Sequence, residues 1–153
     1  MEIKYMKKLE AEKQVGKIAP REPMELKEIK QVEEKFNSGK IFPLAFREYL
    51  FLAGKWGGEG IVDPDFDDVR EDCEEDLEYC GYSMERPYFV FDILDGQSSI
   101  FYLDEEDEDP QIHILDPYGK KRGEFPLVRP NFMGTFSKLI NEAIHRIKKD
   151  ISF

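Results

Sequence analysis

The sequence has few residues of the kinds that build metal centres, disulfide frameworks or membrane spans. Its 153 residues include two cysteines and two histidines, and no run approaches the ~20 apolar residues that span a bilayer. The segment Met1–Lys8 lacks the apolar stretch of a signal peptide. Cys73 and Cys80 lie in a segment with a helical pattern, where a spacing of seven residues places their Cα atoms about 10 Å apart, too far for a disulfide. We therefore expect a cytoplasmic protein with two free thiols.

The common catalytic motifs are also missing. There is no G-x-S-x-G elbow, no HExxH and no recognisable Cys–His pair. The glycine-rich segment 54–60 lacks the GxxxxGK[ST] spacing of a phosphate loop, and Glu59 within it would repel a phosphate. His113 alternates with two isoleucines and is expected to be a solvent-facing or edge residue, and His145 falls on the polar side of a helix. We therefore expect no catalytic residues and no cofactor.

The sequence is rich in aromatic residues and in acidic residues. Hydrophobic residues make up 41% of the chain and aromatic residues 13%, which predicts a folded domain in spite of 36% charged residues. The net charge is −11. Residues 59–109 carry 20 acidic side chains against Arg70 and Arg86, a net of −18, so the remainder carries +7. This polarity is expected to repel nucleic acid and to attract basic partners, although such runs also serve simply to keep a surface solvated.

One acidic segment partly matches a calcium-binding loop. In Asp63–Glu74 acidic residues occupy positions 1, 3, 5 and 12 of an EF-hand pattern. Position 6, which requires glycine, is Asp68, and no amphipathic helix precedes the segment. We interpret it as the start of a solvated helix capped by Asp67 or Asp68, and we expect no metal site. Cation binding by residues 63–82, and with it a metal-dependent hydrolase, stays an open alternative.

The order of the predicted elements indicates an α+β fold. We expect an antiparallel sheet of about four to six strands with helices packed against it. Residues 1–22 form a Lys-rich N-terminal extension and residues 23–153 a single domain. Helices are predicted near 24–36, 43–53, 67–82 and 132–149; strands near 88–95, 98–103 and 111–115, with a short edge piece at 123–128 and a turn at 116–119. Phe132 is placed on the apolar stripe of the last helix.

The same elements resemble the SUKH superfamily (the Smi/Knr family) over roughly residues 24–147. The resemblance rests on the amphipathic segment Glu25–Phe36, on Phe42-Pro43 followed by Phe46-Arg-Glu-Tyr49-Leu50, and on Gly57-Gly58. Further matches are Phe89-Val-Phe-Asp, Phe101-Tyr-Leu-Asp104, Gln111-Ile-His-Ile and Phe136-Ser-Lys-Leu-Ile140. Phe42 replaces the usual leucine before Pro43, and the acidic insertion at 63–82 is longer than a minimal member needs.

The resemblance implies a non-catalytic immunity protein that binds and neutralises a toxin of a bacterial polymorphic or contact-dependent system. Many such toxins are nucleases with basic clefts, which an acidic face would complement. Another protein is therefore the expected partner, and neither nucleic acid nor a membrane is. A general regulatory scaffold with several weak partners is the alternative. The expected contacts are acids of one loop and one helix with one aromatic anchor: Asp104, Glu105, Glu106, Asp107, Glu108, Asp109, Glu71, Asp72, Glu75, Asp76 and Tyr82. Trp56 and Tyr88 are further possible anchors, for which core packing is the competing interpretation.

Overall fold

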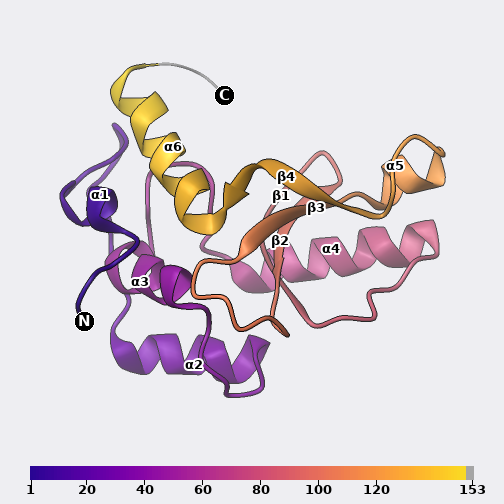
Figure 1. The fold of residues 1–153 in the computed structure, drawn as a ribbon, viewed down its shortest axis with the longest axis horizontal. Helices are drawn as coiled ribbons and strands as arrows, with labels where there is room; N and C mark the ends of the chain where they lie inside the picture. The colour runs from indigo at the N-terminus through magenta and orange to yellow at the C-terminus, as the bar shows by residue number, and fades with distance from the viewer. Residues whose placement is uncertain (151–153) are drawn as a thin grey trace.

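The structure, a computed structural model, describes residues 1–150, in which six helices and four strands follow one another along the chain (Figure 1). The helices are α1 (Lys7–Glu10), α2 (Leu26–Phe36), α3 (Leu44–Ala53), α4 (Phe66–Cys80), α5 (Pro117–Lys121) and α6 (Phe136–Lys148). The strands are β1 (Tyr88–Leu94), β2 (Gln97–Tyr102), β3 (Gln111–Leu115) and β4 (Val128–Thr135). Among residues 1–150, no helix combines the length and apolar character needed to cross a membrane.

The four strands form one antiparallel sheet in the order β1-β2-β3-β4, which confirms the predicted α+β class. Each strand therefore pairs with its neighbour in sequence. The β1–β2 hairpin turns at Asp95 and Gly96, whose φ angles are 51° and 76°. Both residues adopt positive φ, as a tight two-residue hairpin turn requires, and glycine does so without steric cost.

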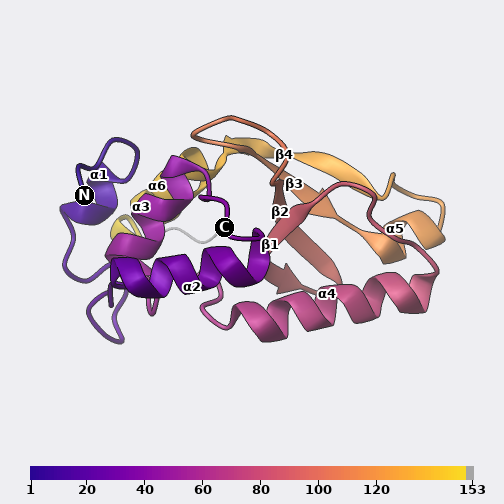
Figure 2. The same ribbon diagram turned by 90° about the horizontal axis from the view of Figure 1, so that it is seen from below.

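Alternate residues of β1 and β2 enter two separate hydrophobic clusters, because successive side chains of a strand point to opposite faces of the sheet. Phe89 and Phe101 join the larger cluster, which contains residues of α2, α3 and α6. Val90 and Ile100 join the smaller cluster, which contains the buried stripe of α4. Figure 2 shows α4 along the lower side of the sheet. The sheet is thus covered on both faces, and α4 alone among the helices supplies the second face in the described residues.

Helix α4 confirms the predicted acidic surface helix, with corrected ends. Its N-cap is Asp65, whose carboxylate accepts a hydrogen bond from the backbone N–H of Asp68, so neither Asp67 nor Asp68 is the cap. It ends at Gly81, which adopts φ 80° in the left-handed region that favours glycine. Cys73 and Cys80 are buried on its inner side as free thiols, as predicted.

The predicted helix near 132–149 begins too early. Residues 128–135 form strand β4, and α6 begins at Phe136. Phe132 lies four residues before Phe136, a spacing that imitates a helical stripe, but its side chain is 93% exposed on β4. Pairing with β3 outweighs the local pattern, because Thr135 aligns with Gln111 and Arg129 with Ile114. The expected turn at 116–119 is also corrected, because Asp116 caps the short helix α5 there.

The N-terminal residues pack into the main core. Ile3, Met6, Leu9 and Val15 are buried in the larger cluster, whereas Ile18 is 83% exposed.

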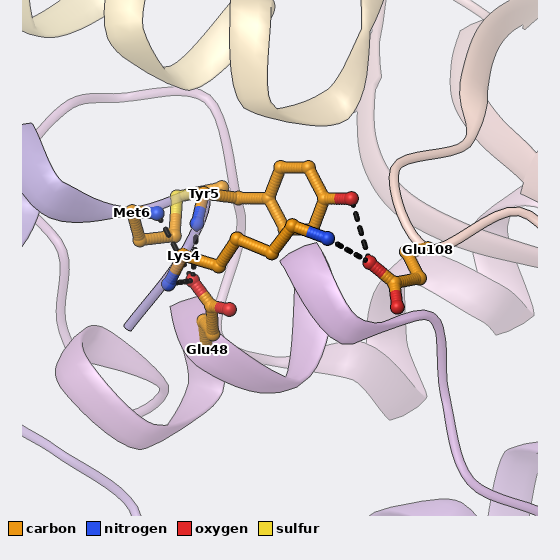
Figure 3. Close-up of polar contacts among 5 residues, drawn as sticks. All are labelled: Lys4, Tyr5, Met6, Glu48 and Glu108. Carbon is orange, nitrogen blue, oxygen red and sulfur yellow. Dashed lines mark hydrogen bonds and ion pairs between the residues drawn. The ribbon is translucent and has the colours of Figure 1, made fainter. Parts of the chain in front are cut away.

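Their backbone is held by one buried carboxylate of α3. Glu48 Oε1 accepts hydrogen bonds from the backbone N–H groups of Lys4, Tyr5 and Met6 at 3.0, 2.7 and 3.0 Å (Figure 3). The segment before α1 is therefore anchored to the helix that forms the centre of the core.

Candidate partner-binding groove

A hollow lies between the β2–β3 loop and the segment that joins α2 to α3. Its volume is about 690 Å³. One wall consists of loop residues 104–108, and the other consists of residues 40–44 with Asn37 and Arg47. We call this hollow the acidic groove. It brings five of the six predicted loop acids, Asp104 to Glu108, to one side of a single depression.

The first two carboxylates of this wall share one cation. Arg86 donates from Nε to Asp104 Oδ2 at 2.9 Å, and from Nη2 to Asp104 Oδ1 at 2.7 Å and to Glu105 Oε1 at 3.1 Å. The hydrogen bonds from Arg86 hold the pKa of Asp104 below its usual range. A bidentate guanidinium–carboxylate contact also fixes the geometry of the loop where it leaves β2.

The fifth residue of the wall, Glu108, is tied to other elements. Lys4 Nζ and Tyr5 Oη donate to Glu108 Oε2 at 2.8 and 2.7 Å, as Figure 3 shows. The hydrogen bond from Lys4, and to a smaller extent that from Tyr5, holds the pKa of Glu108 below its usual value. The carbonyl oxygen of Glu108 accepts from the backbone N–H of Ala45 at 2.8 Å, which joins the loop to the first turn of α3.

Two carboxylates at the tip of the loop remain available to bind a partner. Glu106 and Asp107 are exposed, and in the structure of residues 1–150 neither makes a hydrogen bond or an ion pair. On the opposite wall, Ile41 is 68% exposed and Leu44 is half-buried. Arg47 also lines the groove, and its Nε lies 2.9 Å from Glu33 Oε2 in an internal ion pair. The groove therefore offers negative charge on one side, and on the other apolar surface at Ile41 and Leu44 beside the exposed cation Lys40.

The sixth predicted loop acid, Asp109, does not line the groove. Its carboxylate accepts hydrogen bonds from the backbone N–H of Ser137 at 2.9 Å and from the hydroxyl of the same residue at 2.5 Å. Ser137 lies in the first turn of α6, where backbone N–H groups have no partner within the helix. Asp109 therefore serves as a cap for α6.

The predicted acids of α4 lie on a different surface. Glu71, Asp72 and Glu75 are exposed on the outer side of α4, along the lower edge of Figure 2, whereas the β2–β3 loop runs along the upper edge. Asp76 is half-buried and accepts a hydrogen bond from Tyr118 Oη at 2.8 Å. The predicted contact residues thus form two separate acidic surfaces.

The predicted aromatic anchors are mainly packing residues. Tyr88 is 6% exposed and belongs to the smaller cluster. Tyr82 is half-buried against that cluster, with Lys120 Nζ 4.6 Å from its ring centre. Trp56 is half-buried in the segment that pairs with Glu22. None of the three lines the acidic groove.

Sequence reasoning missed the roles of the two basic residues within the acidic segment. Arg70 lies over the ring of Tyr88 at 4.1 Å, and Arg86 lies over the ring of Tyr102 at 3.6 Å. The two tyrosines are direct partners in the β1–β2 register. Arg70 also pairs with Glu74 at 2.7 Å, so both arginines link acidic side chains to the same end of the β1–β2 pair. Arg70 and Arg86 are the only basic residues among the 20 acids of residues 59–109, and this pattern could have predicted that they pair with acids.

The exposed carboxylates of the acidic groove can bind cationic groups. In the described part of the chain, no group of three or more His, Cys, Asp and Glu side chains is arranged to hold a metal ion. His113 is half-buried and lies 4.9 Å from the ring of Tyr102; burial lowers its pKa. His145 is exposed.

Comparison of the chain with known protein families, with curated proteins and with solved structures finds no match.

Proposed function

We propose that this protein is a non-catalytic binding domain that holds a basic partner protein in the acidic groove. The observation that carries the proposal is the composition of the groove walls. Five acidic residues line one side. The other side combines the exposed Ile41 and the half-buried Leu44 with the cations Lys40 and Arg47, and Glu106 and Asp107 are free to receive lysine or arginine side chains. Arginine is favoured at such sites because its guanidinium binds carboxylates in a fixed geometry and packs on apolar surface.

We further propose that the partner is a toxin and that the domain is an immunity protein of a bacterial polymorphic or contact-dependent system, acting in the cytoplasm. The resemblance to the SUKH superfamily suggests this role, and the net charge of −18 over residues 59–109 is consistent with it. A nuclease toxin must bind phosphates with basic side chains. A groove that carries carboxylates would occupy such a cleft and would speed association at low salt.

The experiment compares the two acidic surfaces. The tagged protein captures partners from its own cell lysate at low salt, and the affinity for the recovered protein is then measured by calorimetry. We expect the double variant Glu106→Lys with Asp107→Lys to weaken binding at least about tenfold. The matched control, Glu71→Lys with Asp72→Lys on α4, carries the same charge change and should weaken binding less than about threefold.

Three outcomes decide between the hypotheses. A single basic partner, released by salt and affected mainly by the groove variant, supports the proposal. An equal effect of both variants would show that overall charge, and not the groove, determines binding. Several partners, each weakly bound, would indicate the regulatory scaffold.

A further inference from the structure

A second hollow surface of opposite charge lies between α1 and α6. Two depressions of about 350 and 430 Å³ adjoin each other there and share Lys8 and His145. The first lies between α1 and the last turns of α6, and the second extends along α6 to Met133 of β4. Figures 1 and 2 both place α1 beside α6. We call the two depressions together the basic groove; it shares no lining residue with the acidic groove.

The charge of this surface is positive because its two acids are already neutralised. Glu12 pairs with Lys148 at 2.5 Å, and Glu142 pairs with Arg146 at 2.9 Å. Three further cations line the surface without an ion pair among residues 1–150: Lys8, Lys138 and Lys149. All three are exposed. Their ammonium groups can donate to an anionic ligand with no internal contact to break.

An exposed aromatic residue lies next in sequence to a lining residue of this surface. Phe132 precedes the lining residue Met133 and is 93% exposed. The β3–β4 register shifts between Gln111 and His113, whose partners are Thr135 and Pro130, so β4 bulges across residues 131–134. A bulge on an edge strand redirects side chains, and exposed aromatic residues of this kind commonly supply much of the energy of a protein interface. Ala11 adds exposed apolar surface within the groove, whose lining also includes the buried Ile144.

We propose that the basic groove binds a short acidic peptide segment of a partner protein, with an apolar residue of that segment against Phe132 and Met133. Carboxylates of the segment would accept hydrogen bonds from Lys8, Lys138 and Lys149. A short segment fits better than an extended polyanion, because the net charge of −11 repels nucleic acid and anionic membranes at long range while the groove attracts a carboxylate locally. This inference does not rest on the function proposed for the acidic groove.

The test is fluorescence anisotropy of the full chain with a set of labelled acidic peptides, each rich in Asp and Glu and carrying one aromatic residue. We expect saturable binding that weakens as salt rises. The variant Lys8→Glu with Lys138→Glu should lower affinity at least about tenfold. The matched control, Lys27→Glu with Lys30→Glu on the exposed side of α2, should change it less than about threefold.

Phe132→Ala separates anchoring from simple charge attraction. It should weaken binding at both low and high salt, because an apolar contact is not screened. Unchanged melting temperatures of all variants establish that folding is intact. Absence of saturable binding to every peptide at low salt, or equal losses in the groove and control variants, would overturn the proposal. Tighter binding of anionic vesicles or single-stranded DNA than of any peptide would overturn the assignment to a peptide.

Discussion

The β2–β3 loop and the helix α4 are both densely acidic, yet their carboxylates have different surroundings. In the loop, Asp104 and Glu105 contact Arg86, Glu108 contacts Lys4 and Tyr5, and Asp109 caps α6. On α4, within the part of the chain that the structure describes, the exposed acids Glu71, Asp72 and Glu75 make no hydrogen bond or ion pair.

The difference follows from where each segment lies in the fold. The loop joins β2 to β3 and contacts the N-terminal segment, α3 and α6, so its carboxylates are close to donors from distant parts of the chain. Helix α4 contacts the sheet through its apolar stripe and leaves its other side in solvent. Four of the six loop acids therefore bind groups from other elements. On α4, Asp67, Glu74 and Asp76 also have partners, and it is Glu71, Asp72 and Glu75 that keep the surface hydrated. The predictions that follow test this distinction between bonded and solvated acids.

The largest effect is expected at Glu48, the fully buried acid that holds the N-terminal backbone. Glu48→Ala leaves three backbone N–H groups without their acceptor, and we expect a loss of about 3–5 kcal/mol in the free energy of unfolding. Urea denaturation measures it. The control Glu75→Ala, at a solvated acid of α4, should change stability by no more than about 0.5 kcal/mol. Similar losses of stability in Glu48→Ala and Glu75→Ala would contradict the distinction between bonded and solvated acids.

A smaller effect is expected at Asp109. Asp109→Ala removes the acceptor for the first turn of α6, and we expect a loss of about 1 kcal/mol, as for other helix caps. Faster hydrogen exchange of the Ser137 amide should accompany it. Asp109→Asn retains an acceptor oxygen and should recover part of the loss, whereas Asp107→Ala should have no measurable effect. A stable Asp109→Ala variant with unchanged exchange would show that the contact does not stabilise α6.

A third effect, of about the same size as that at Asp109, concerns Asp92 of β1, which is half-buried and makes no ion pair within residues 1–150. Burial raises its pKa to about 6, with Asp63 and Glu59 adding to the shift. Because the native state holds the proton more tightly than the unfolded state, the contribution of Asp92 to stability is present below the unfolded pKa near 4 and is lost as pH rises through about 6.

Asp92→Asn should therefore stabilise the protein near pH 7 by about 1 kcal/mol, a value reduced for solvent screening, and by almost nothing near pH 4. Denaturation of both proteins at the two pH values measures the difference. A constant difference across this pH range would show that Asp92 does not titrate as the structure indicates.

Local patterns in the sequence predicted the elements with short-range signals. The ends of α2, α3, α4, β1 and β3 fall within two residues of the predicted ones, because helical spacing, strand alternation and capping act between near neighbours. The prediction failed at Phe132, where the spacing to Phe136 suggested helix but pairing with β3 produced strand. Strand pairing is non-local, so no window around Phe132 contains the deciding interaction.

The sequence predicted only one wall of the acidic groove. The acidic loop was identified from composition, but its opposite wall around Ile41 and the contacts of Arg86 with Asp104 and Glu105 were not. The sequence also could not separate the acids of the loop from those of α4, which the fold places on different surfaces.

The sequence by itself determined the strong charge polarity, the α+β class and the apolar side of each long helix, because these depend on composition and on local periodicity. The tertiary structure alone decided which carboxylates are neutralised and which face solvent. Lys4 and Glu108 are 104 residues apart in the chain and 2.8 Å apart in space. The surroundings of each charge depend on such long-range contacts, and these form only when the whole chain folds.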